Sequence, residues 1–140
     1  MSNKEELGTN HVKGYELGPM PKYGNYPQSL LDNFSGKPLL GPKAHLKSDE
    51  GHIGLLELAP GTDYPAHIHP WPEAYYIVNG SAECVWGEDK FTAEPGTTIY
   101  APPNTSHAMK VISEEPVLAI IFGWAPGGRK EVFDEDGRLI

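Results

Sequence analysis

The sequence predicts an all-β protein with a single jelly-roll or barrel domain. Its 140 residues are typical of one domain and are enough to bury a core without disulfides. The 16 glycines and 14 prolines favour a chain with many turns over a helical bundle. About eight short strand-like runs fall within roughly 75 residues, which is the density of a jelly roll or small barrel.

The chain before this β-rich region is expected to be irregular. Five prolines interrupt every periodic stretch between residues 1 and 50. We expect an N-terminal arm there, with one short helix over Gln28–Phe34. The arm could cover a barrel mouth, cross to a second subunit or act as a surface tether. The barrel is expected over 51–125, and a C-terminal tail over 126–140.

From Gly51 onward, runs of β-forming residues alternate with turn residues. Asn79-Gly80 is a strong hairpin-turn dipeptide. The expected strands are His52–Ala59, Ala66–His69, Ala74–Asn79, Ser81–Trp86, Lys90–Ala93, Thr97–Ala101, His107–Ile112 and Val117–Trp124.

The charge balance excludes some classes of partner. The formal net charge is −8, from 11 basic and 19 acidic residues, so the chain lacks the basic surface of a nucleic-acid binder. The same charge argues against an anionic membrane surface. The longest apolar run, Pro116–Trp124, is far shorter than the roughly 20 residues that span a bilayer. We expect neither nucleic acid nor membrane as a partner.

The cysteine content and the N-terminal sequence indicate the compartment. Cys84 is the only cysteine, so no intrachain disulfide can form, which fits a reducing environment. The first ten residues are polar and acidic, unlike a secretory signal. We therefore expect a cytoplasmic protein.

Four residues have the chemistry of metal ligands. His67 and His69 are two apart on an expected strand, so their side chains leave the same face. Glu73 follows a rigid Pro-Trp-Pro spacer, and His107 begins a later strand. Imidazole and carboxylate ligands suit first-row transition metals, and an octahedral shell would keep positions for water or substrate. A His-x-His pair alone is common by chance, but the full spacing is not.

That spacing closely resembles the cupin superfamily. The first cupin motif, G-x5-H-x-H-x3-E-x6-G, is matched in full by Gly61, His67, His69, Glu73 and Gly80. The resemblance implies a jelly-roll β-barrel with one divalent transition metal per chain, such as Fe, Mn, Zn or Ni. Its ligands would be His67, His69, Glu73 and His107.

The second cupin motif, G-x5-P-x-G-x2-H-x3-N, is matched at three positions, Gly96, Pro102 and His107. Asn104 replaces the glycine, a mild change because Asn tolerates the left-handed conformation. Val111 replaces the last asparagine, which is not a ligand in the family. Neither departure affects the expected metal site.

Tyr75 is the candidate catalytic residue. It lies two residues after Glu73, so strand alternation places its phenol on the metal side, and Tyr76 should face outward. The string His67-x-His69-x3-Glu73-x-Tyr75 with His107 resembles the cupin dimethylsulfoniopropionate lyases. In that family the metal holds the substrate carboxylate and a tyrosine removes the adjacent proton, so that β-elimination follows.

Two other activities are compatible with a cupin. One is an iron-dependent dioxygenase. The other is a sugar isomerase, or a non-catalytic module that binds a sugar or another small molecule, because the stretch 94–103 is similar to cupin phosphoglucose isomerases. Only Lys90 and Lys110 are basic between residues 51 and 128, which argues against a phosphorylated substrate. We favour a metal-dependent lyase acting on a small, carboxylated molecule.

The remaining expectations concern assembly and the pocket walls. Exposed edge strands favour a homodimer, with strands or the arm at the interface. Met109 should line the cavity, and Trp71 and Trp124 are further candidates for its wall. His52 could face inward beside the ligands or be an ordinary surface or core histidine, and Cys84 is expected to pack in the core.

Overall fold

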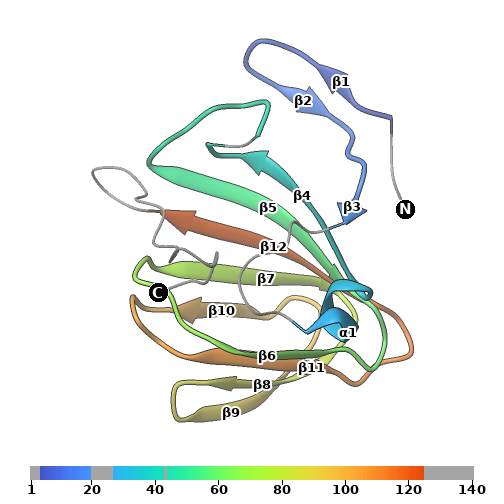
Figure 1. Ribbon diagram of the computed structural model, residues 1–140, viewed down its shortest axis with the longest axis vertical. Helices are drawn as coiled ribbons and strands as arrows, with labels where there is room; N and C mark the ends of the chain where they lie inside the picture. The colour runs from blue at the N-terminus through green and yellow to red at the C-terminus, as the bar shows by residue number, and fades with distance from the viewer. Residues whose placement is uncertain (1–3, 20–26, 43, 125–140) are drawn as a thin grey trace.

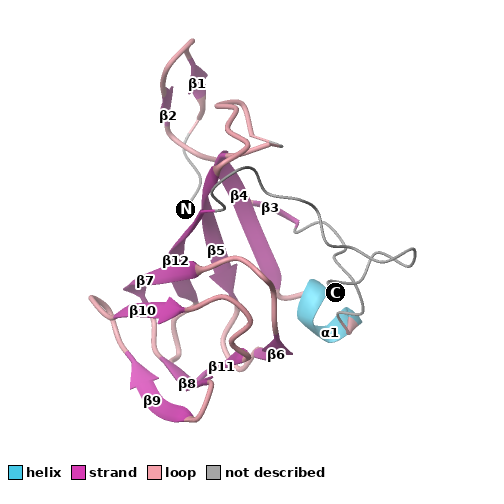
Figure 2. Ribbon diagram, turned by 90° about the vertical axis from the view of Figure 1, so that its left-hand side faces the viewer, coloured by secondary structure: helices cyan, strands magenta, loops and turns pink. Residues whose placement is uncertain are grey.

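The computed structural model describes residues 4–19, 27–42 and 44–124. Two antiparallel sheets face each other (Figures 1 and 2). The larger has six strands in the order β10-β7-β12-β5-β4-β3. Their bounds are β3 Gly18–Pro19, β4 Phe34–Leu40, β5 Gly51–Leu58, β7 Glu73–Asn79, β10 Thr98–Ala101 and β12 Val117–Trp124.

The smaller sheet has four strands in the order β6-β11-β8-β9. Their bounds are β6 Asp63–His67, β8 Ala82–Trp86, β9 Asp89–Ala93 and β11 His107–Val111. A short hairpin of β1 (Glu6–Leu7) and β2 (Val12–Lys13) stands away from both sheets, at the top of both views. Helix α1, Gln28–Leu31, lies beside the sheets. Among the described residues, no helix has the length and apolar character needed to cross a bilayer.

The hydrophobic core fills the space between the two sheets. Strand alternation turns every second side chain inward, so Leu56 and Ile77 of the larger sheet face Cys84 and Val111 of the smaller one. These side chains are almost completely removed from water. The expected all-β architecture is therefore confirmed, and the expected packing role of Cys84 agrees with its place in the core.

Every strand expected between residues 51 and 125 is present. The largest shift concerns β6, which begins at Asp63 and ends at His67, whereas Ala66–His69 was expected. The early start is explained by pairing of Asp63 and Tyr64 with Lys110 and Met109. His69 leaves the ladder, and its carbonyl instead accepts a hydrogen bond from the backbone N–H of Asn104.

The expected irregular arm contains one long strand that the sequence reading missed. Strand β4 pairs with β5 from Phe34 to Leu40 and so belongs to the larger sheet. Pro38 argued against a strand, but it lies at a register shift, where a missing N–H is tolerated. The helix expected over Gln28–Phe34 ends at Leu31, because Phe34 already starts β4. The tail 126–140 lies outside the described residues.

The outer face of the larger sheet carries exposed apolar side chains. Tyr76 and Val78 of β7, Tyr100 of β10, and Ile120 and Phe122 of β12 are each between 37% and 52% exposed. Apolar surface gathered in this way is typical of a contact region. The homodimer expected from the sequence stays a prediction.

The turn at Gly80 provides a test of the fold. Gly80 has φ +78, and an added Cβ would collide with the carbonyl oxygen of Pro116. We expect Gly80→Ala to lower the free energy of unfolding by about 1–3 kcal/mol for backbone strain, with a further loss from the collision. Gly61→Ala is the matched control, because Gly61 has φ +76 and nothing within 4 Å of the added atom. Urea unfolding would measure both, and equal losses would contradict the role of Pro116.

Candidate metal centre

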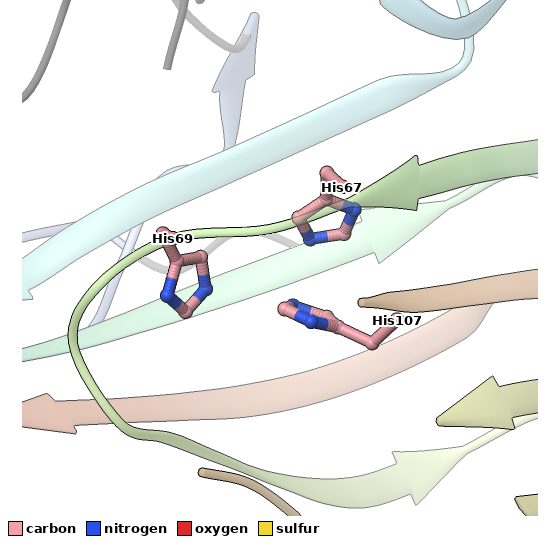
Figure 3. A group of neighbouring side chains, drawn as sticks. All are labelled: His67, His69 and His107. Carbon is pink, nitrogen blue, oxygen red and sulfur yellow. The ribbon is translucent and has the colours of Figure 1, made fainter. Parts of the chain in front are cut away.

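Three histidines converge between the ends of two paired strands. His67 is the last residue of β6, His107 is the first residue of β11, and the two lie opposite each other in the ladder. His69 follows in the loop after β6. One ring nitrogen of each histidine lies within 4.8 Å of those of the other two (Figure 3). A single ion could therefore contact all three rings.

The second nitrogen of each ring is already used. All three Nδ1 atoms lie 2.8–3.0 Å from a backbone carbonyl oxygen. A carbonyl can only accept, so Nδ1 must carry the hydrogen, and in the neutral ring the lone pair is left on Nε2. This is the usual arrangement of a metal-binding histidine. The acceptors for His67, His69 and His107 are the carbonyls of Pro65, Trp71 and Thr105, respectively.

Two of the inward-facing nitrogens make no hydrogen bond to the described residues. The Nε2 atoms of His69 and His107 are buried and make no hydrogen bond there. A buried polar atom without a partner costs free energy, and such atoms in a folded protein usually have an explanation. A bound metal ion would supply the missing partner for both atoms. The three-histidine cluster therefore fits a transition metal.

The electrostatics keep two of these rings neutral. Burial and, to a smaller extent, the nearby His107 imidazole lower the pKa of His67 from 6.5 to about 4. Burial also lowers the pKa of His107, although its bond to the Thr105 carbonyl acts in the opposite direction. A neutral imidazole is the form that binds metal, so both rings are ready near neutral pH.

Glu73 lies beside the cluster without being part of it. It begins β7 and is 8% exposed. Its Oε1 is 3.4 Å from His69 Nε2, and its Oε2 is 3.2 Å from His52 Nε2. Burial alone would raise the pKa of Glu73, but the contacts with these two imidazoles outweigh it and hold the pKa below its usual range. Its role as a fourth ligand stays a prediction.

Tyr75 faces the interior, as strand alternation predicts. It is 1% exposed, whereas its neighbour Tyr76 is 46% exposed. The Tyr75 ring centroid lies 6.0 Å from that of His107 and 5.4 Å from that of Trp86. The structure thus brings Tyr75 to the His107 side of the cluster. Its catalytic role stays a prediction.

Aromatic rings pack against all three histidines. Tyr64 stacks on His67 at 4.4 Å, and Trp71 stacks on His69 at 4.6 Å. Trp86 lies 5.0 Å from His107, which is also its partner in the ladder. These rings limit the access of water to the imidazoles.

Sequence reasoning named Trp71 and missed both Tyr64 and Trp86. For Trp86, the alternating inward positions of the expected strand Ser81–Trp86 were the available signal. The contact of Tyr64 with His67 could not be expected from the sequence. It depends on an irregularity in the pairing of β6 with β11, between His107 and Met109.

Other residues that the sequence singled out lie outside the three-histidine cluster. Met109 is 2% exposed and faces inward, as expected. Trp124 is not part of the pocket wall, because it stacks on the exposed Tyr100 at the outer face. Burial raises the pKa of Cys84 to about 11, so it stays a thiol.

An open hollow of about 470 Å³ adjoins the cluster. Trp86 lines it and also packs on His107, so this indole lies where the two regions meet. The lining contains none of the three histidines and does not include Tyr75. The candidate metal centre is therefore the cluster and not this hollow.

Comparison with known proteins agrees with the geometry. A family model for dimethylsulfoniopropionate lyases matches residues 9–119. DddL of Cereibacter sphaeroides is 28% identical over 119 residues, covering 84% of this chain and 49% of that protein. The dimethylsulfoniopropionate lyase DddQ of Ruegeria pomeroyi is 28% identical over 93 residues, covering 66% of this chain and 46% of its own length. The chain thus spans about half the length of these relatives.

Solved structures identify the fold. The crystal structure of Ruegeria pomeroyi DddQ superposes with a TM-score of 0.69 at 23% identity, covering 79% of this chain and 56% of that one. The cupin domain of Schizosaccharomyces pombe Cnp3 superposes with a TM-score of 0.62 at 16% identity, covering 82% and 75%. Since the family model covers most of the chain, the protein belongs to the dimethylsulfoniopropionate lyase family and has a cupin fold.

Proposed function

We propose that the protein is a metal-dependent lyase that cleaves dimethylsulfoniopropionate or a closely related β-substituted propionate. The observation that carries the proposal is the buried cluster of His67, His69 and His107, with Tyr75 beside it. The family match supports the same reaction class. No observation favours the dioxygenase or the sugar-related alternatives over this one.

The proposed reaction is a β-elimination. A base removes a proton from the carbon next to the carboxylate, and the electron pair left behind forms a carbon–carbon double bond. As that double bond forms, the carbon–sulfur bond breaks with its electrons going to sulfur, which gives acrylate and dimethyl sulfide, and the base keeps the proton. A divalent ion held by His67, His69, His107 and Glu73 would bind the substrate carboxylate and stabilise the charge that develops on it.

Tyr75 is the proposed base. Its ring lies at the His107 side of the cluster and is buried from bulk water. A cation close to a phenol favours the phenolate, which is the form that can accept a proton. Burial among Trp86 and other core side chains keeps water from competing for that proton.

The first prediction concerns metal content. The purified protein should bind about one transition-metal ion per chain, and His69→Ala or His107→Ala should empty the site because each removes one of few ligands. His45→Ala is the control, since His45 is exposed and bonds the carbonyl of Gly8. Elemental analysis by mass spectrometry after dialysis would measure occupancy. Full occupancy in a His67→Ala, His107→Ala double variant would refute the site.

The pH dependence of the metal-free protein follows from the buried rings. The pKa of His67 is 6.5 when unfolded and about 4 when folded, so between these values the unfolded chain binds more protons. The free energy of unfolding should therefore fall as pH is lowered from about 6.5 to about 4, and the lowered pKa of His107 acts in the same direction. Urea unfolding of chelator-treated protein would measure it. The slope should be smaller in His67→Ala, and an unchanged slope would contradict the argument.

The role of Tyr75 can be tested by removing one oxygen. Tyr75→Phe should keep metal and fold but lower turnover of dimethylsulfoniopropionate by about 10²–10⁴-fold, the usual contribution of a general base. Tyr76→Phe is the matched control, because Tyr76 faces outward. Gas chromatography of released dimethyl sulfide would give the rates. Full activity in Tyr75→Phe would exclude it as the base, and no release by the metal-loaded parent protein would exclude this substrate.

A further inference from the structure

His52, Gly123 and Glu73 form one row across three neighbouring strands. In the larger sheet β12 lies between β5 and β7, and Gly123 is opposite His52 on one side and opposite Glu73 on the other. The strands carrying His52 and Glu73 are therefore two inter-strand spacings apart, about 10 Å. Their side chains can meet only by passing over the middle residue.

Gly123 leaves the space for that contact. A Cβ added to Gly123 would overlap Cε1 of His52 and lie 2.5 Å from its Nε2. The φ angle of Gly123 lies outside the left-handed range, so the backbone conformation does not explain a glycine here. What explains it is the His52 ring, which lies over the glycine and reaches the opposite strand.

His52 contacts one oxygen of the Glu73 carboxylate, and the other oxygen of that carboxylate faces the three-histidine cluster. His52 Nε2 lies 3.2 Å from Glu73 Oε2, and both side chains are largely buried. The other oxygen, Oε1, lies 3.4 Å from His69 Nε2. His52 is not a member of the three-histidine group, so its contact with the site runs through Glu73.

We propose that His52 is a positioning residue, which orients the Glu73 carboxylate toward the metal site across the gap left by Gly123. This inference rests on the proposed metal centre. Carboxylate ligands are commonly held by hydrogen bonds from residues behind them, and loss of such a partner typically weakens metal affinity by about 10–100-fold. Without His52, the Glu73 carboxylate keeps only its contact with His69 among those described.

The test is the cobalt(II) and zinc(II) affinity of the metal-free protein, measured by competition with a chelator. We expect His52→Ala to weaken affinity by about 10–100-fold while saturation stays near one ion per chain. His52→Gln should recover much of the loss, because its amide can donate to the same oxygen. The cobalt absorption spectrum of His52→Ala should also shift, which a change in fold stability alone would not produce.

Glycine variants test the space separately. Gly123→Ala should displace the His52 ring and weaken metal affinity in the same way. Gly54→Ala is the matched control in the same sheet, since its added Cβ meets only an ordinary contact of 3.5 Å with the Lys37 carbonyl. An equal loss of affinity in Gly54→Ala would overturn the proposal, because it would reflect general damage to the sheet.

A double-mutant cycle separates positioning from an independent effect. If His52 acts through Glu73, His52→Ala should change affinity little in a Glu73→Gln background. Additive losses would overturn the proposal, and so would unchanged affinity and spectrum in both His52→Ala and Gly123→Ala.

If the parent protein itself binds neither ion, the metal centre fails and the positioning role fails with it. Binding by the parent with unaffected variants overturns the positioning role alone.

Discussion

The candidate site depends on the register between β6 and β11. Antiparallel pairing sets His67 directly opposite His107, which brings their ring centroids to 4.0 Å. A slip of one residue would turn His107 to the other face of the sheet and leave the cluster incomplete. The loop after β6 is tied to the turn before β11, where Asn104 adopts φ 61 and its N–H bonds the carbonyl of His69. One strand pair and one turn thus assemble all three imidazoles.

Much of this arrangement could be predicted from local sequence, because strand alternation and turn residues act over a few positions. The inward direction of Tyr75, the outward direction of Tyr76 and the bounds of most strands follow from these signals. What could not be predicted depends on which distant strands become neighbours. The stacking of Tyr64 on His67 depends on the register shift between β6 and β11. The contact of His52 with Glu73 depends on the place of β12 between β5 and β7. Strand β4 was missed because Pro38 is acceptable only at an irregularity in the ladder.

The two sheets contribute differently to the site. The smaller sheet and its loop supply the imidazoles, whereas Glu73 and Tyr75 come from β7 of the larger sheet. The core between the sheets sets how far apart these two sets of groups lie. Its side chains are closely packed, so a change in a core side chain can move one set relative to the other. The geometry of the candidate site is therefore sensitive to core residues that are not part of it.

The hydrogen bonds from the three Nδ1 atoms have one further consequence. Each acceptor carbonyl lies two residues from its own histidine, so every ring is oriented by its own short segment of chain. A metal ion bound at the proposed centre would meet rings that are already turned toward it, and the conformational entropy of ordering them would be lost during folding rather than during ion binding. With Nδ1 occupied, coordination through Nε2 is the only mode open to each ring, so ion uptake should resemble rigid docking more than a local refolding.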